Sequence, residues 1–282
     1  MLVNTREMLK NALENNYAIA HFNINNLEWA KNILEECQAN NSPVIIGISE
    51  SAIKYMGGYN VVAGIVVTLM KDENITIPVA LHLDHGSSFE SCKSAIDAGF
   101  TSVMIDASKH ELEKNIEITK QVVDYAKKYD VTVEAEIGHI GGASGVADEE
   151  FFAKTEECEE LLNQTGIDSL APALGSVHGI YKGEPKLNFD RMLEIRNKLN
   201  IPLVLHGGTG IPDADIKKAI SCGIAKLNIN TELQLAWTTA VRKFLNENSE
   251  VYDPRKVIGS GTDAMKKSIS DKLQLLGCCN KI

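Results

Sequence analysis

The chain has 282 residues, of which 44% are hydrophobic and 23% charged, a balance typical of globular proteins. We expect one domain over residues 1–282, because barrels of about 250 residues commonly form single domains. The net charge of −10 argues against nucleic acid or an anionic membrane as partner, although local groups still allow an anionic substrate. We see no apolar run of transmembrane length and no signal peptide, and six cysteines without a CxxC pair indicate a reducing, cytoplasmic location.

Short apolar runs alternate with longer amphipathic segments along the chain. The predicted strands are residues 18–22, 44–48, 79–83, 102–105, 131–137, 169–174, 203–205 and 225–229. The predicted helices are residues 27–38, 88–98, 112–129, 155–165, 190–198, 213–222 and 263–276. Ser88 and Asp213 are expected to cap helix starts, and Gly99 and Gly223 to follow helix ends. This alternation implies parallel strands and favours a closed (β/α)8 TIM barrel over an open doubly wound sheet.

Polar side chains occupy the carboxyl ends of nearly all these strands, where barrel enzymes carry their catalytic groups. They are Asn23, Ser49, Asp84, His85, Asp106, Glu136, His178, His206 and Asn228. Three of them are histidines, and three imidazoles around an open fourth position form a catalytic zinc site. The alternative for each histidine is an ordinary hydrogen-bonded residue.

Asp84 directly precedes one of these histidines. A carboxylate beside a metal-bound substrate is placed to move protons, whereas the alternative role is only to orient a metal ligand. Asp106 and Glu136, from the next two strands, are candidates for a carboxylate metal position or for an outer shell. His82 shares a strand face with Asp84 and either supports the site or packs in the core.

Two segments predict a phosphate site. Residues 206–210 (HGGTG) follow one strand, and residues 228–231 (NINT) follow the next and open a helix. Glycine lets backbone N–H groups approach an anion closely, and a helix N-terminus favours negative charge. Lys182 and Arg255 are candidate phosphate partners, with ordinary surface charge as the alternative. The glycine-rich residues 138–145 are expected to form a mobile loop.

Four ordered motifs resemble those of class II, zinc-dependent fructose-bisphosphate and tagatose-bisphosphate aldolases of bacteria. They are residues 81–86 (LHLDHG), 175–179 (GSVHG), 205–212 (LHGGTGIP) and 228–231 (NINT). The likeness runs from residues 22–25 (FNIN) to residues 252–255 (YDPR), which is nearly the whole chain. It therefore implies reversible cleavage of fructose 1,6-bisphosphate to dihydroxyacetone phosphate and glyceraldehyde 3-phosphate.

The resemblance also implies roles for individual residues. Asp84 would be the catalytic proton-transfer residue, with zinc held by His85, His178 and His206. Asp106 and Glu136 match a second divalent metal position. Substrate contacts would come from Asn23, Ser49, Gly179, Lys182, Gly207, Gly208, Thr209, Asn228, Ile229, Asn230, Thr231 and Arg255. Family members are typically homodimers or homotetramers, so the arginine is expected from a neighbouring subunit, and a monovalent cation (Na⁺ or K⁺) assists phosphate binding.

The sequence departs from the family after residues 141–142, where relatives carry an acidic cluster. Here the acids come later, at Asp148, Glu149 and Glu150. Either one of these acids is the second proton-transfer residue, or turnover relies more heavily on Asp84. Cleavage of tagatose bisphosphate or another ketose phosphate is the alternative substrate preference. More distant alternatives are Schiff-base chemistry at Lys226, a metal-dependent hydrolase, and a barrel that only binds phosphosugars.

Overall fold

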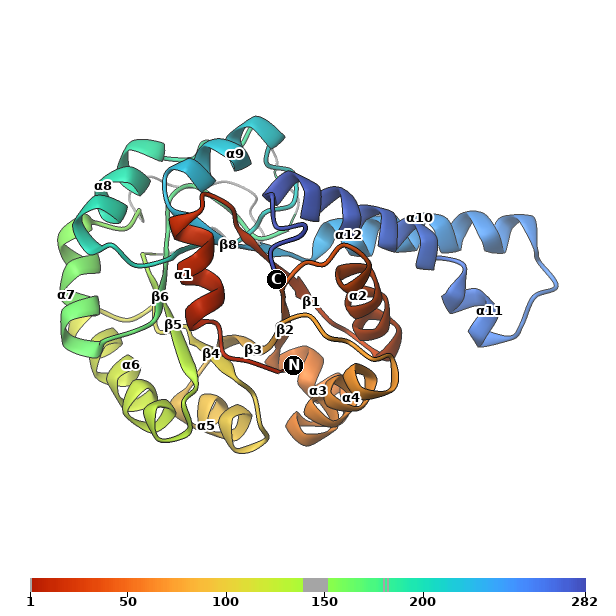
Figure 1. Ribbon diagram of the computed structural model, residues 1–282, viewed down its shortest axis with the longest axis horizontal. Coiled ribbons are helices and arrows are strands. Elements are labelled where there is room, and N and C mark those ends of the chain that lie inside the picture. Colours follow the sequence, from red (N-terminus) through yellow and green to blue (C-terminus); the bar gives the residue numbers. More distant parts are fainter. Residues whose placement is uncertain (1, 139–151, 180, 182) are drawn as a thin grey trace.

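The computed structural model describes residues 2–138, 152–179, 181 and 183–282. Its strands are β1 (Ile19–Asn23), β2 (Val44–Ser49), β3 (Val79–Gly86), β4 (Ser102–Ile105), β5 (Thr132–Ile137), β6 (Ser169–Pro172), β7 (Leu203–Leu205) and β8 (Ile224–Ile229). Each strand pairs in parallel with the next, and β8 pairs with β1, so the sheet closes into a barrel (Figure 1). The predicted (β/α)8 barrel is confirmed.

Helices surround the barrel wall (Figure 1). They are α1 (Arg6–Glu14), α2 (Leu27–Ala39), α3 (Glu50–Met56), α4 (Tyr59–Asp72), α5 (Phe89–Asp97), α6 (Leu112–Ala126), α7 (Thr155–Thr165), α8 (Phe189–Leu199), α9 (Asp213–Ser221), α10 (Thr231–Glu247), α11 (Pro254–Gly259) and α12 (Thr262–Leu276). Their apolar faces pack on the outer face of the strands, as Ile33 and Leu34 of α2 illustrate by their complete burial. Amphipathic spacing is what allows each helix to cover the sheet on one side and face solvent on the other.

The boundaries differ from the predictions in a few places. Ser88 caps α5 by accepting from the Ser91 backbone N–H, as predicted, but Asp213 is the first residue of α9 and Pro212 occupies the cap position. The predicted helix at residues 112–129 is α6 followed by a 3₁₀ turn at Lys127–Tyr129. The predicted strand at residues 169–174 is shorter, because β6 ends at Pro172.

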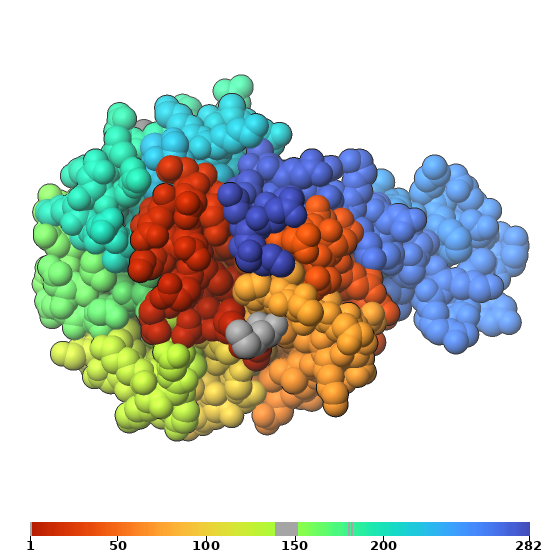
Figure 2. All heavy atoms as spheres, viewed as in Figure 1, coloured from red at the N-terminus to blue at the C-terminus, as the bar shows by residue number. Residues whose placement is uncertain are grey.

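The predictions missed α11 and gave α10 only as a helix opened by residues 228–231. They also missed α1, α3 and α4. The last two lie between β2 and β3 and are separated by Gly57 and Gly58, which both have positive φ and so end one helix and redirect the chain into the next. α1 lies across the amino-terminal end of the barrel, where Leu9 and Ala12 are buried, and Figure 2 shows it covering the middle of that face. The opposite, carboxyl end of the strands is left for the functional site.

The outer part of α10, the following turn and α11 project beyond the barrel wall, and we call residues 242–259 the arm (Figures 1 and 2). Asp253 caps α11 through its side chain, and Tyr252 beside it is 93% exposed. Within the described ranges, no single helix has the length and hydropathy of a membrane span, and only the bent pair of α3 and α4 reaches them jointly.

Candidate active site and metal centre

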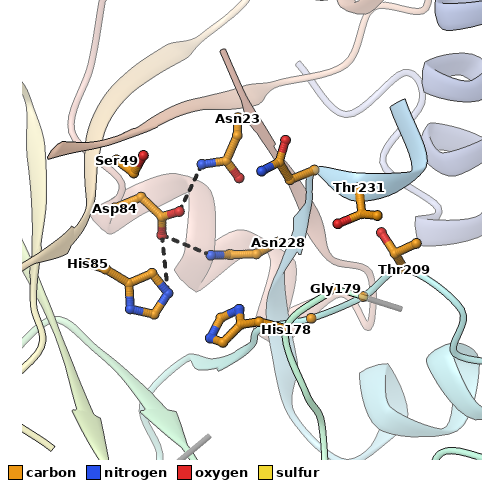
Figure 3. Close-up of a pocket in the computed structure, with 12 residues that line it drawn as sticks. Asn23, Ser49, Asp84, His85, His178, Gly179, Thr209, Asn228 and Thr231 are labelled. Atoms are coloured by element: carbon orange, nitrogen blue, oxygen red, sulfur yellow. Dashed lines mark hydrogen bonds and ion pairs between the residues drawn. The ribbon is translucent and has the colours of Figure 1, made fainter. Parts of the chain in front are cut away.

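A cavity of about 230 Å³ opens at the carboxyl end of the strands (Figure 3). Its lining residues are Asn23, Ser49, Asp84, His85, His178, Gly179, Gly207, Gly208, Thr209, Asn228, Asn230 and Thr231. Every one of them was predicted from the sequence as a site residue. The barrel closure therefore brings together side chains that are up to about 200 positions apart in the chain, as expected for an active site at this end of a barrel.

Asp84 lies in the wall of this cavity and is only 6% exposed. Its Oδ2 accepts from Nδ2 of Asn23 at 2.8 Å, and its Oδ1 accepts from Nδ2 of Asn228 at 3.2 Å (Figure 3). Burial by itself raises the pKa of the Asp84 carboxyl, but His21, His85, His206 and Lys226 more than offset this, so the net pKa lies well below its usual range. Asp84 is thus an oriented, ionised carboxylate, the state that a general base requires.

The three predicted zinc histidines meet beside Asp84. His85, His178 and His206 each offer a nitrogen within 4.8 Å of the others, and Nε2 of His85 lies 3.0 Å from Nδ1 of His206. Nε2 of His85 also lies 4.0 Å from Oδ1 of Asp84. Three imidazole nitrogens that converge in this way fit a catalytic zinc ion, which takes three protein ligands and leaves one position for substrate.

A second group shares one of these histidines. Nδ1 of His85 lies 3.1 Å from Oδ2 of Asp106 and 3.9 Å from Oε2 of Glu136, and the three side chains form a second possible metal group. Ser108, which the sequence analysis missed, donates its hydroxyl to Asp106 at 2.7 Å and to Glu136 at 3.1 Å. The two nitrogens of His85 therefore face two different donor sets.

The charge states of the imidazoles suit metal binding. Burial, and then the neighbouring His206 and His85, lower the pKa of His178 to about 3, and burial also lowers the pKa of His206. Burial would likewise lower the pKa of His85, but Asp84, Asp106 and Glu136 raise it to about 9. Two of the imidazoles are neutral near pH 7 and have a free lone pair, whereas a cation would have to displace a proton from the third.

The predicted phosphate cradle lies beside the histidines. Gly207 has φ of 67°, and a side chain there would put its Cβ 2.0 Å from the Val177 carbonyl oxygen, so only glycine fits. Thr209 accepts from the Glu232 backbone N–H through its hydroxyl at 3.2 Å, which ties this glycine segment to the first turn of α10. Main-chain N–H groups at a glycine turn and at a helix start are the usual partners of a phosphate.

Some predicted residues lie elsewhere or outside the described residues. Ile229 is fully buried in β8 and does not line the cavity. Arg255 lies on the arm, where its side chain is 89% exposed and its guanidinium pairs with Asp253 at 2.9 Å. The described residues do not include Lys182, most of the loop predicted at residues 138–145, or the three acids Asp148, Glu149 and Glu150.

Lys226, the candidate Schiff-base residue, does not line the cavity. Its side chain is 1% exposed and pairs with Glu134 Oε2 at 2.7 Å, inside the barrel and below the histidines. His82 also lies in this layer, where its Nδ1 is 2.8 Å from the Ser102 hydroxyl and its Nε2 is 3.4 Å from Nζ of Lys226. The sequence analysis missed Glu134, although its position two residues before Glu136 in one strand predicts that both side chains face the same way.

Comparison with known proteins agrees with this geometry. The family model described as class-II fructose-bisphosphate aldolase matches residues 3–281. The chain is 57% identical to fructose-bisphosphate aldolase of Geobacillus stearothermophilus, with 99% of this chain and 98% of that protein covered. It is 56% identical to the protein of that name from Staphylococcus epidermidis strain RP62A, with 99% of each covered.

Solved structures share the fold. The YdjI aldolase of Escherichia coli K12 superimposes with a TM-score of 0.88 at 36% identity, covering 100% of this chain and 99% of the other. Fructose-bisphosphate aldolase of Campylobacter jejuni gives a TM-score of 0.83 at 25% identity, with 100% and 97% covered. Given the matching barrel, the three convergent histidines and a family match over almost its whole length, the chain belongs to the class II fructose-bisphosphate aldolase family.

Proposed function

We propose that the chain catalyses the reversible aldol cleavage of fructose 1,6-bisphosphate to dihydroxyacetone phosphate and glyceraldehyde 3-phosphate. The observation that carries this proposal is the buried Asp84 carboxylate beside three convergent imidazoles. The names of the relatives at 56–57% identity support the same substrate. Fructose 1,6-bisphosphate cleavage needs a base for one hydroxyl and a centre that stabilises the charge left by the broken bond. Asp84 would be the base, and a metal ion held by the three imidazoles would be that centre.

The proposed cofactor is Zn²⁺ held by His85, His178 and His206. When bound, it would act as a Lewis acid that polarises the ketose carbonyl and stabilises the negative charge left on the dihydroxyacetone phosphate half. Histidine nitrogens are preferred zinc ligands, and an all-imidazole set leaves the ion its full positive charge for this purpose.

Asp84 is the proposed general base. It would remove the proton from the C4 hydroxyl, after which the C3–C4 bond breaks and glyceraldehyde 3-phosphate is released. The amides of Asn23 and Asn228 hold its two oxygens, so the carboxylate enters the reaction already oriented. The acid that returns a proton to the dihydroxyacetone phosphate half is proposed to come from Asp148, Glu149 or Glu150. The alternative is that none of them takes part and turnover relies more heavily on Asp84.

The substrate phosphates are assigned to the two ends of the cavity. We propose that the main chain at residues 207–209 and 230–231, with Gly179 and Lys182, holds the phosphate of the dihydroxyacetone half, assisted by Na⁺ or K⁺. Ser49 lies beside Asp84 in Figure 3, away from Thr209 and Thr231, and would hold the second phosphate. Asp106 and Glu136 would supply the second divalent position with His85.

Arg255 is proposed to act from a neighbouring subunit of a homodimer or homotetramer. Its side chain is almost fully exposed on the arm and lines no part of the cavity in its own chain, so a role in substrate binding requires a second copy. We also propose a cytoplasmic location, since all six cysteines are unbonded thiols, as expected in a reducing compartment.

The test is a coupled assay for triose phosphates on fructose 1,6-bisphosphate, with and without a chelator, and with tagatose 1,6-bisphosphate in parallel. We expect cleavage of the fructose substrate, its loss after chelation and its return with Zn²⁺. Faster turnover of the tagatose substrate would replace the proposed specificity. Chelator-resistant cleavage, or trapping of the substrate on the protein by borohydride, would overturn the zinc mechanism in favour of a Schiff base.

A further inference from the structure

Beneath the active-site cavity lies a second layer of polar side chains inside the barrel. His21, His82, Glu134 and Lys226 project inward from β1, β3, β5 and β8, and each is at most 2% exposed. Barrel interiors are usually filled by branched apolar residues. Because removing a carboxylate and an ammonium from water costs several kcal/mol per ion, an ion pair here is weak support for stability and calls for another role.

Glu134 is the centre of this layer. One carboxylate oxygen, Oε1, lies 3.0 Å from Nε2 of His206, and the other, Oε2, lies 2.7 Å from Nζ of Lys226. Lys226 is in turn 3.4 Å from Nε2 of His82. Both oxygens of the carboxylate are therefore engaged, one by a proposed zinc ligand and the other by a buried cation.

These contacts determine which nitrogen of His206 carries hydrogen. A carboxylate only accepts hydrogen bonds, so Nε2 of His206 must be the N–H donor. Nδ1 then has the free lone pair, and Nδ1 is the nitrogen that lies 3.0 Å from His85 at the proposed metal position. The amide of Asn228, 3.3 Å from the same Nδ1, is consistent with an acceptor at that atom.

We propose that Glu134, held through its other oxygen by Lys226, is a positioning residue that fixes His206 with Nδ1 directed at the metal. The proposal rests on the proposed zinc site and adds to it a function for two residues that touch neither metal nor substrate. It also gives Lys226 a role that differs from that of a Schiff-base nucleophile, since its ammonium must stay paired.

The first experiment reads the tautomer of His206 in metal-free protein by ¹⁵N NMR of histidine-labelled samples. We expect the Nε2–H form in the wild type and a mixture or the Nδ1–H form in Glu134→Leu, which removes the acceptor. The double variant Glu134→Gln with Lys226→Met keeps an acceptor oxygen without a buried charge and should restore the Nε2–H form. Ser102→Ala, which alters the same layer only at His82, is the control and should leave His206 unchanged.

The second experiment measures Zn²⁺ affinity by competition with a chromophoric chelator. Loss of such a supporting partner typically weakens metal binding about 10–100-fold. We expect a loss of that size in Glu134→Leu, a smaller loss in the double variant and none in Ser102→Ala. If Glu134→Leu does not fold, the comparison of the double variant with Glu134→Gln alone decides, because the single variant leaves Lys226 unpaired and should bind Zn²⁺ more weakly.

The outcomes separate this proposal from the proposed function. An unchanged His206 tautomer and unchanged Zn²⁺ affinity in Glu134→Leu would overturn the role of Glu134 while leaving the zinc aldolase intact. Equal losses in Ser102→Ala would also overturn it, since they would indicate a general effect on the core. A wild type that binds no Zn²⁺ would instead remove the metal centre, and the NMR result would then show whether Glu134 still fixes the imidazole.

Discussion

Asp84 and His85 are consecutive residues of β3, yet both side chains face the same cavity. Successive residues of a strand normally point to opposite faces. Here His85 has φ of 52°, and the pairing of β3 with β4 shifts register between Leu83 and Gly86. This left-handed residue, uncommon outside glycine, places a proposed zinc ligand 4.0 Å from the proposed base.

Asp84→Asn keeps the shape of the side chain but removes the base. Losing a positioned general base typically costs about 10²–10⁴-fold in rate. We expect kcat for fructose 1,6-bisphosphate cleavage to fall by that factor while Zn²⁺ content stays unchanged. The measurement is the coupled triose-phosphate assay with metal analysis of the same samples. Asp72→Asn, an exposed acid at the end of α4, is the control, and full activity in Asp84→Asn would remove Asp84 from the role.

The two donor sets around His85 predict different metal contents for three variants. His85→Ala should lose binding at both positions, His178→Ala only at the position with three imidazoles, and Asp106→Ala only at the position with two carboxylates. After dialysis, metal analysis should find tightly bound Zn²⁺ in Asp106→Ala but not in the two histidine variants. Retention of wild-type zinc by His178→Ala would contradict the assignment of the catalytic position.

Arg255 can be tested by mixing two impaired chains. Arg255→Ala should raise KM for fructose 1,6-bisphosphate by about 10-fold or more, because a charge-assisted hydrogen bond contributes about 1.5–3 kcal/mol. Arg242→Ala, on the exposed side of α10, should not. If the arginine acts in the partner's site, refolding Arg255→Ala together with Asp84→Asn creates one intact site per mixed dimer and restores activity. No gain over the separate chains would place the arginine in its own subunit's site or in none.

His21 predicts a specific acid sensitivity. The side chain is fully buried, and burial, followed by the nearby Lys226, lowers its pKa from 6.5 to about 3. In the unfolded chain, His21 therefore binds a proton as the pH falls below 6.5, whereas in the folded chain it binds one only near pH 3. The folded state is therefore destabilised relative to the unfolded state as the pH falls through this window.

Urea unfolding of metal-free protein at pH 7 and pH 5 measures this effect. One such group should cost about 2 kcal/mol between these two values. His21→Gln should lose less stability than the wild type over the same interval by about that amount, because the other histidines titrate alike in both proteins. An identical loss in the two proteins would show that His21 is protonated in the folded state.

The cysteines should differ sharply in reactivity. Burial raises the pKa of Cys158 to about 12 and that of Cys278 to about 11, and Cys37, Cys92 and Cys222 are also buried, whereas Cys279 is only partly covered. Since the thiolate is the reactive form, a disulfide reagent at pH 8 should modify one thiol of the native protein quickly and the rest only after denaturation. Cys279→Ser should abolish the fast reaction, whereas the control Cys158→Ser should not. A fast reaction that persists in Cys279→Ser would contradict this prediction.

Much of the barrel followed from local sequence alone. The strand order was predicted from properties of neighbouring residues. These properties are apolar runs of strand length, amphipathic segments between them, and glycines after helix ends, such as Gly99 and Gly223. The unpredicted helices α3 and α4 show the limit, since two glycines with positive φ split one crossover into two helices. The motifs around Asp84, His178 and His206 were likewise readable, because a polar residue at the end of a buried strand stands out without any structure.

Tertiary structure decided how those side chains work together. The sequence could not show that Glu134 touches both His206 and Lys226, or that Ser108 joins Asp106 to Glu136, because these contacts depend on the register and closure of the barrel. Nor could it show the left-handed backbone of His85. The sequence itself gives the type of each side chain and the alternation of side chains between the two faces of a strand. The contact between Glu134 and Lys226, which are 92 positions apart, forms only when the sheet closes into a barrel.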